Sequence, residues 1–219
     1  MNKRKATALA GISSMQKNRA ERPAVFLDRD GTINREVNYL RHLEDVELLP
    51  GAARAIRILN RSGFLVIVVT NQSGIARGLL DVDMLHRINQ EIQWRLQQEG
   101  AHVDGWYFCP HHPEAAPLPG ATRPYTKECR CRKPAPGMVE QAVAEMEIDL
   151  SCSFMVGDSL RDMELAQNCG IPGILVRTGH GEDACRKLLG QSTEGLPRPA
   201  AVVEDLLEAA HWIIAGRAS

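Results

Sequence analysis

The fold is decided by the stretch Val25-Phe-Leu-Asp28-Arg-Asp30-Gly-Thr32. Its apolar half predicts a short buried strand, and the turn at Gly31 places two carboxylates at the carboxyl end of that strand. Side chains two residues apart on an extended segment project to the same side, so Asp28 and Asp30 share one site. Such a pair can bind a divalent cation or divide nucleophilic and acid/base roles. Taken alone, the pattern also fits a turn rich in Asp without any chemistry.

Apolar strands alternate with amphipathic helices along the rest of the chain. Continuous apolar runs predict strands at residues 24–27, 64–69, 103–108, 153–156, 173–176 and 201–203. Apolar positions with helical spacing predict helices at residues 52–59, 85–96, 138–146, 160–169 and 205–215. This alternation predicts an α/β fold with a doubly wound, mostly parallel sheet, whose ligands bind beyond the carboxyl ends of the strands.

Composition excludes several classes of protein. The 219 residues are 44% apolar, which is enough for one ordinary domain, and the longest apolar run, residues 64–69, is far too short to span a membrane. A net charge of −1 gives no global field to attract nucleic acid or anionic lipid. We therefore expect a cytoplasmic protein that binds neither nucleic acid nor membrane, with a monomer as the default state.

The amino-terminal segment differs in composition from the rest. Residues 1–22 carry six basic groups and one acid but little apolar bulk. We expect a disordered basic tail at residues 1–22, with a transit peptide as the alternative, followed by one domain at residues 23–219.

Residues 110–136 form a long segment without helical or strand periodicity, flanked and interrupted by possible metal ligands. Cys109-Pro-His111 and Cys129-Arg-Cys131 supply three thiols and an imidazole in two closely spaced pairs. This set predicts a tetrahedral Zn²⁺ site, closed by protein ligands and therefore structural, that clips the loop 109–131. His112 is the rival of His111, and unliganded thiols are the alternative to metal.

Four stretches, taken in order, resemble the signatures of the haloacid dehalogenase superfamily of phosphohydrolases. They are the Asp-x-Asp-Gly-Thr motif after the strand at 25–27, the strand end at 68–71, the Lys-Pro motif within 131–137 and the Gly-Asp motif within 156–162. The resemblance spans residues 23–190 and implies the Rossmann-like fold of that superfamily.

The resemblance also implies roles for individual residues. Asp28 would attack phosphorus and Asp30 would act as general acid and base. Mg²⁺ would be held by Asp28, the backbone carbonyl of Asp30 and Asp158, while Thr70 and Lys133 would stabilise the transferring phosphoryl group. Asp162 lies one helical turn after Asp158. An orienting or solvated role fits this position as well as direct contact with the metal does.

The segments after the first two strands are too short to hold a cap domain, so loops must select the substrate. Within the superfamily, the chain resembles capless phosphatases of a small phosphorylated sugar, a heptose bisphosphate used to make surface polysaccharide. Arg132 is expected to contact the phosphoryl group with its planar fork, and Arg77 either reaches a distal phosphate or is solvated. The remaining expected substrate contacts are Glu36, Val37, Asn38, Tyr39, Asn71, Gln72 and Ser73.

Two other functions fit the same motifs. Histidinol-phosphate phosphatases share the phosphatase signatures and the zinc clip. A ligand-binding protein without catalytic activity is a more distant alternative, because a fold alone does not guarantee activity.

Overall fold

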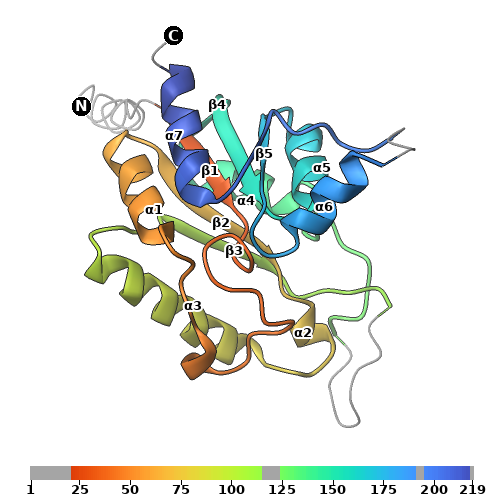
Figure 1. The fold of residues 1–219 in the computed structure, drawn as a ribbon. Helices are drawn as coiled ribbons and strands as arrows, with labels where there is room; N and C mark the ends of the chain where they lie inside the picture. The colour runs from red at the N-terminus through yellow and green to blue at the C-terminus, as the bar shows by residue number, and fades with distance from the viewer. Residues whose placement is uncertain (1–20, 115–123, 191–194, 218–219) are drawn as a thin grey trace, which may run out of the picture.

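The computed structural model describes residues 21–114, 124–190 and 195–217. Its centre is a six-stranded sheet in the order β3-β2-β1-β4-β5-β6, in which all neighbouring strands are parallel (Figure 1). The strands are β1 (Arg22–Leu27), β2 (Leu65–Asn71), β3 (Gly105–Cys109), β4 (Ile148–Gly157), β5 (Gly173–Val176) and β6 (Ala201–Val203). The predicted doubly wound parallel sheet is thus confirmed.

Helices cover both faces of the sheet. They are α1 (Ala52–Arg61), α2 (Ser73–Ala76), α3 (Val82–Gln98), α4 (Gly137–Glu145), α5 (Leu160–Cys169), α6 (Gly181–Leu188) and α7 (Leu206–Arg217), with a short 3-10 helix, η1 (Leu43–Asp45). Apolar residues of α1, α3 and α7 pack in one core and those of α4 and α5 in another. This arrangement has three layers, with the sheet between two layers of helices.

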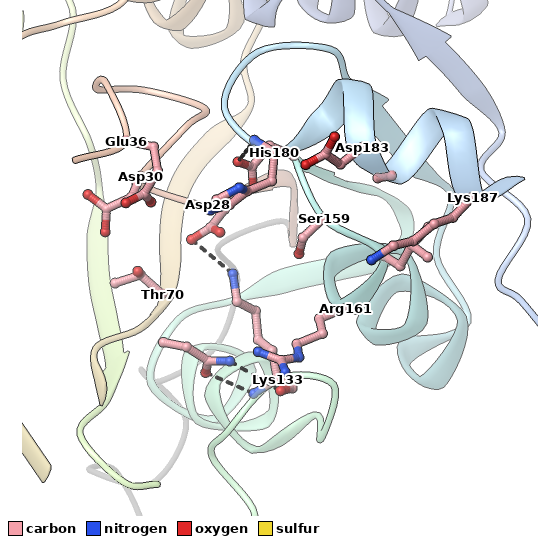
Figure 2. Close-up of a pocket in the computed structure, with 14 residues that line it drawn as sticks. Asp28, Asp30, Glu36, Thr70, Lys133, Ser159, Arg161, His180, Asp183 and Lys187 are labelled. Carbon is pink, nitrogen blue, oxygen red and sulfur yellow. Dashed lines mark hydrogen bonds and ion pairs between the residues drawn. The ribbon is translucent and has the colours of Figure 1, made fainter. Parts of the chain in front are cut away.

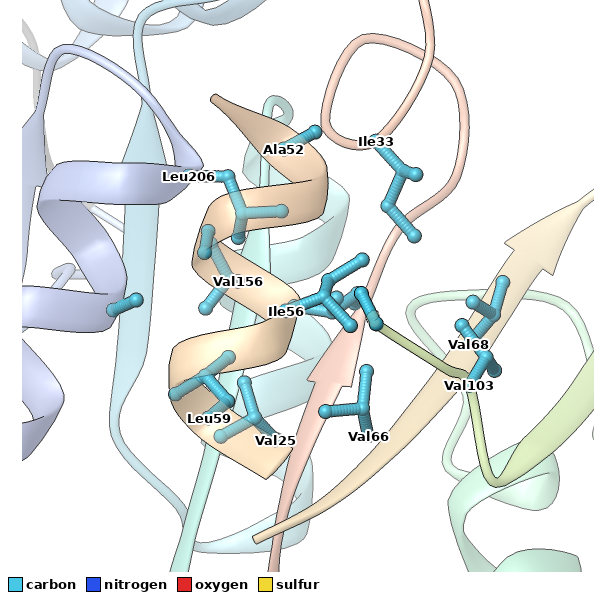
Figure 3. Packing of buried hydrophobic residues seen from close by; sticks show 14 of the residues in the cluster. Val25, Ile33, Ala52, Ile56, Leu59, Val66, Val68, Val103, Val156 and Leu206 are labelled. Carbon is cyan, nitrogen blue, oxygen red and sulfur yellow. The ribbon is translucent and has the colours of Figure 1, made fainter. Parts of the chain in front are cut away.

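The central strand β1 contributes to both cores because its side chains alternate between the faces. Val25 and Leu27 lie in the same core as the apolar residues of α1, whereas Ala24 and Phe26 lie in the core of the opposite face. All four are fully buried. Figure 3 shows Val25 beside Leu59 of α1. A continuous apolar run, rather than an alternating one, is therefore what a strand covered on both faces requires.

The structure differs from the sequence-based expectation at several boundaries. Strand β1 begins at Arg22, one residue before the expected start of the domain at residue 23, and residues 1–20, where the basic tail was expected, lie outside the described part of the chain. Strand β4 starts five residues earlier than predicted, and β3 includes Cys109. Helices α2 and α6 were not predicted, since α2 has four residues and half of the eight residues of α6 are charged.

The carboxyl ends of β1, β2 and β4 meet at one edge of the sheet, since all three strands are parallel and Leu27 pairs with both Val68 and Val156. Among the described residues, the segments after β1 and β2 contain only η1 and α2 before the next long helix, which agrees with the expected lack of a cap domain. In the part of the chain that the structure describes, every helix is too short or too polar to cross a membrane.

A buried serine joins β1 to β4 where their register is irregular. The Ala24 amide donates to Ser153 Oγ at 2.9 Å, and that hydroxyl donates to the Asp149 carbonyl at 2.6 Å. Ser153 is fully buried, so its removal leaves a strand amide without a partner. We expect Ser153→Ala to lower the free energy of unfolding by about 1–3 kcal/mol in urea denaturation. The exposed Ser151→Ala is the matched control, and an equal loss in both variants would contradict this account.

Candidate active site

The polar groups predicted from the strand ends lie around one cavity of about 460 Å³. Asp28 and Asp30 follow β1, Thr70 lies near the end of β2, Asp158 follows β4, and Lys133 enters from the loop before α4, as Figure 2 shows in part. The volume lies in the range of cavities that bind metabolites. These five residues, far apart in the sequence, thus face the same space.

Lys133 is buried between two carboxylates. Its Nζ lies 2.9 Å from Asp28 Oδ1 and 2.7 Å from Asp162 Oδ1, and its side chain is 3% exposed. Burial alone would lower the pKa of Lys133, but the charges of Asp162 and Asp28 outweigh it and raise this pKa. The ammonium is therefore charged and fixed beside Asp28.

Asp162 is buried beside Lys133, which favours the orienting role among those left open by the sequence. Its Oδ2 accepts hydrogen bonds from the amide (3.1 Å) and hydroxyl (2.6 Å) of Ser159 at the start of α5, while Oδ1 faces Lys133. A solvated role is excluded because Asp162 is fully buried. Asp162 thus ties the first turn of α5 to the ammonium of Lys133.

Asn71 also positions Lys133, a function that sequence analysis did not identify. The Asn71 side chain donates to the Lys133 carbonyl at 3.1 Å and accepts from the Lys133 amide at 3.0 Å. Asn71 lines the cavity as well, so its predicted substrate contact and this backbone clamp involve the same side chain. This contact could not be predicted from the sequence, because Asn71 and Lys133 are 62 residues apart.

Three carboxylates form a cluster that fits a divalent cation. Asp28, Asp158 and Asp162 each place an oxygen within 4.8 Å of the others. Burial raises the pKa of Asp28 to about 6, against the opposing charge of Lys133. Burial, together with the charges of Asp28 and Asp162, raises the pKa of Asp158 to about 8. Three carboxylates and one ammonium carry a formal charge of −2, which one Mg²⁺ would neutralise.

The backbone packs closely around Asp158. A Cβ at Gly31 or at Gly179 would each stand 2.1 Å from Asp158 Oδ2, and both glycines have positive φ. The His180 amide donates to the same oxygen at 2.8 Å. Glycine is required at both positions, because any side chain would displace the carboxylate.

Asp30 has a different environment from Asp28. Its two oxygens accept four hydrogen bonds, two from Arg29 and one each from Asn34 and Gln72, at 2.8–3.1 Å. Burial would raise the pKa of Asp30, but the Arg29 charge and these hydrogen bonds outweigh it and lower the pKa. The side chain stands outside the three-carboxylate cluster, so a metal contact from Asp30 would come only from its backbone carbonyl.

A smaller cavity of about 220 Å³ adjoins the first and contains most of the predicted substrate contacts. Asn38 has a left-handed backbone with φ of 61°, and its amide donates to the Glu36 carboxylate. Val37 differs from the expectation, since its side chain packs against the apolar core. The predicted residues that line this cavity are Asp30, Glu36, Asn38, Tyr39, Asn71, Gln72 and Ser73.

Arg132 lies between the cavity and the cysteine cluster. Its guanidinium donates to the His111 carbonyl at 3.0 Å, and burial together with the charges of Arg161 and Arg77 lowers its pKa. Arg132 does not line either cavity described above, whereas Arg161 and Lys187, which sequence analysis did not select, line the larger one. They come from the first turn of α5 and from α6, elements whose approach to the site depends on the fold.

The four predicted zinc ligands converge. The distances are 3.5 Å for Cys109 to Cys129, 3.2 Å for Cys109 to Cys131 and 3.3 Å for Cys129 to Cys131, between Sγ atoms. His111 Nδ1 lies 3.3 Å from Cys131 Sγ and 3.7 Å from Cys109 Sγ. A tetrahedral zinc with Zn–S bonds of about 2.3 Å requires separations of about 3.8 Å between sulfurs. The residues present fit a closed Zn²⁺ site, in which His111 rather than His112 faces the thiols.

We expect Cys129→Ser, or prolonged exposure to a strong chelator, to lower both the melting temperature and the activity. The thiols would lose the metal that orders the loop leading to Lys133. Elemental analysis and thermal denaturation measure the two effects, and Cys152→Ser, at an exposed cysteine outside the cluster, is the control. If the protein is purified without zinc and keeps its full stability, the structural zinc site is contradicted.

Comparison with known proteins agrees with this geometry. Residues 130–209 match the family model described as "HAD-hyrolase-like". The chain is 42% identical over 193 residues to the D-glycero-D-manno-heptose-1,7-bisphosphate 7-phosphatase of Thermosynechococcus vestitus, covering 88% of this chain and 95% of that protein. It is 43% identical over 159 residues to the D-glycero-beta-D-manno-heptose-1,7-bisphosphate 7-phosphatase of Escherichia coli K12, covering 72% of this chain and 80% of that one.

Solved structures also include phosphatases of heptose bisphosphate that are similar to this chain. A crystal structure of D,D-heptose 1,7-bisphosphate phosphatase from B. bronchiseptica, complexed with magnesium and phosphate, superposes with a TM-score of 0.75 at 34% identity. The match covers 89% of this chain and 99% of that one. The chain therefore belongs to the haloacid-dehalogenase-like hydrolases, in the family of the D-glycero-D-manno-heptose-1,7-bisphosphate 7-phosphatases.

Proposed function

We propose that this protein removes the 7-phosphate of D-glycero-D-manno-heptose 1,7-bisphosphate, in the synthesis of nucleotide-activated heptose for surface polysaccharide. The observation that carries the proposal is the meeting of Asp28, Lys133 and Asp158 at the end of the sheet, in a chain about 43% identical to phosphatases of this substrate. The larger cavity and the adjoining smaller one give room for a sugar that carries two phosphates.

In the first step, an oxygen of Asp28 attacks phosphorus and the bond to the sugar oxygen breaks. The product is an aspartyl-phosphate and an alkoxide, which takes a proton from Asp30. Because Arg29 and its hydrogen bonds keep Asp30 ionised in the free protein, Asp30 takes up this proton when the phosphate dianion binds, since a nearby negative charge raises the pKa of a carboxyl group. Asp28 carries this role because its carboxylate lies in the cavity wall beside the Lys133 ammonium, 2.9 Å away. The positive charge offsets the repulsion between a carboxylate and a phosphate dianion.

In the second step, water attacks the phosphorus of the aspartyl-phosphate and Asp30 accepts the proton from that water. The bond from phosphorus to the Asp28 oxygen breaks, and inorganic phosphate leaves. Asp30 serves in both steps because it has delivered its proton in the first and is ionised for the second. Thr70, 2% exposed and in the cavity wall, can donate its hydroxyl to a phosphate oxygen.

Two metal ions complete the proposal. Asp28, Asp158 and the backbone carbonyl of Asp30 would hold Mg²⁺, which when bound would neutralise charge on the transferring phosphoryl group. Cys109, His111, Cys129 and Cys131 would hold a structural Zn²⁺. The zinc cluster acts on the site through the chain, since Cys131 stands two residues before Lys133 and Arg132 between them bonds the His111 carbonyl.

The substrate assignment is tested by phosphate release from purified protein with Mg²⁺. We expect at least a hundredfold higher kcat/KM for one anomer of the heptose bisphosphate than for histidinol phosphate, about 2.7 kcal/mol in the transition state. A preference for histidinol phosphate would reject the sugar substrate but keep the phosphatase chemistry. Absence of turnover with any phosphate monoester would restore the alternative of a binding protein.

Replacing the nucleophile tests the first step. We expect Asp28→Asn to reduce kcat to background, because an amide oxygen cannot form the aspartyl-phosphate, while the protein remains folded by circular dichroism. Glu44→Gln, in the 3-10 helix η1 outside both cavities, is the matched acid-to-amide control. Substantial hydrolysis by Asp28→Asn would remove Asp28 from this role.

Metal dependence tests the carboxylate cluster. Activity should disappear when Mg²⁺ is removed and return when it is added back, because the cluster of charge −2 otherwise repels the substrate dianion. Steady-state rates across a Mg²⁺ titration measure the effect. Undiminished activity in a magnesium-free solution would contradict the roles given to Asp28 and Asp158.

A further inference from the structure

Arg29, between the two site aspartates, is turned away from the cavity into the protein. It is fully buried, and its guanidinium makes a two-point contact with Asp30, Nε to Oδ1 at 3.1 Å and a terminal nitrogen to Oδ2 at 2.8 Å. Its other terminal nitrogen donates to Asn89 Oδ1 at 3.1 Å. Arg29 thus joins the Asp30 carboxylate to helix α3, 60 residues further along the chain.

Asn89 is a polar residue on the apolar face of α3. It is 6% exposed, and the other buried residues of this helix are Leu85, Ile88, Ile92 and Leu96. Burying an amide there costs free energy unless its hydrogen bonds are satisfied. The hydrogen bond from Arg29 satisfies the amide oxygen of Asn89, which packing alone would leave without a partner.

The fork of Arg29 restricts Asp30 more than its other partners do. Asn34 donates one hydrogen bond to Oδ1 and Gln72 one to Oδ2, from two separate side chains. A planar guanidinium that bonds both oxygens fixes the plane of the carboxylate, provided that the guanidinium itself is held. Asn89 accepts a hydrogen bond from the terminal nitrogen of Arg29 that does not contact Asp30.

We propose that Arg29 and Asn89 are positioning residues, which orient the Asp30 carboxylate toward the leaving-group oxygen. The inference rests on the proposed role of Asp30 as general acid. It concerns only the transfer of the proton, because neither residue lines the cavities in which the substrate is placed.

The step can be isolated by comparing two substrates, phenyl phosphate and p-nitrophenyl phosphate. They have similar shapes, but p-nitrophenolate is a stable anion that leaves with little help from an acid, whereas phenolate needs more. The ratio of their kcat/KM values includes only steps up to departure of the phenol. It is therefore insensitive to hydrolysis of the aspartyl-phosphate and to a general loss of active protein.

Two variants disturb the positioning without touching Asp30. Asn89→Leu keeps the size of the side chain and removes the acceptor, and Arg29→Lys keeps the charge and removes the fork. Either variant should lose about tenfold more kcat/KM on phenyl phosphate than on p-nitrophenyl phosphate, a part of what a general acid contributes. If Asn89→Leu fails to fold, Arg29→Lys carries the test.

The control is Gln93→Leu, on the same helix, whose amide oxygen accepts from the Val103 amide and does not contact Asp30 or Arg29. It should leave the ratio of the two substrates unchanged. An equal loss on both substrates in Asn89→Leu and Arg29→Lys, or no loss, would overturn the inference. Asp30→Asn separates the two levels of the proposal: if it also leaves the ratio unchanged, the general-acid role of Asp30 is what fails.

Discussion

The site depends on the burial of an excess of negative charge at the end of the sheet. Asp28, Asp158 and Asp162 lie together, and the Lys133 ammonium offsets only one of their charges. Burying charge is costly unless it is paired. The fold meets this cost with the hydrogen bonds of Ser159 and the His180 amide, and it leaves a net charge that a divalent cation would neutralise. The same excess of negative charge therefore favours a divalent cation and, without that cation, repels a phosphate dianion.

The Cys/His cluster is connected to the larger cavity through the backbone. Cys109, the last residue of β3, pairs with Asn71 of β2, and the Gln72 amide donates to the Cys109 carbonyl at 2.8 Å. Asn71 in turn clamps the backbone of Lys133, which follows Cys131 by two residues. The loop before α4 has too little apolar surface to order itself, and these contacts fix the position of the buried Lys133.

The alternation of strands and helices, the strand-end carboxylates and the grouping of the cysteines with His111 could all be predicted, because each depends on local patterns: apolar runs, residues two apart, and paired Cys and His. Contacts between residues that are far apart in the sequence could not be predicted. The clamp between Asn71 and Lys133 and the network from Asp30 to Asn89 join residues about 60 positions apart. Val37 was grouped with its neighbours by sequence, but only the backbone turn at Asn38 determines which side chains face the cavity. Helix α6 was missed because it has only eight residues, of which four are charged.

The central claim is that Asp28 carries the phosphoryl group between the two steps. The most direct measurement uses Asp30→Asn, in which water attack is slowed, with p-nitrophenyl phosphate, whose leaving group needs little acid. Rapid acid quench, borohydride reduction and peptide mass spectrometry should then find homoserine at position 28, the product of reducing an aspartyl-phosphate. Phosphorylation at another residue, or continued release of phosphate without modification of Asp28, would contradict the account.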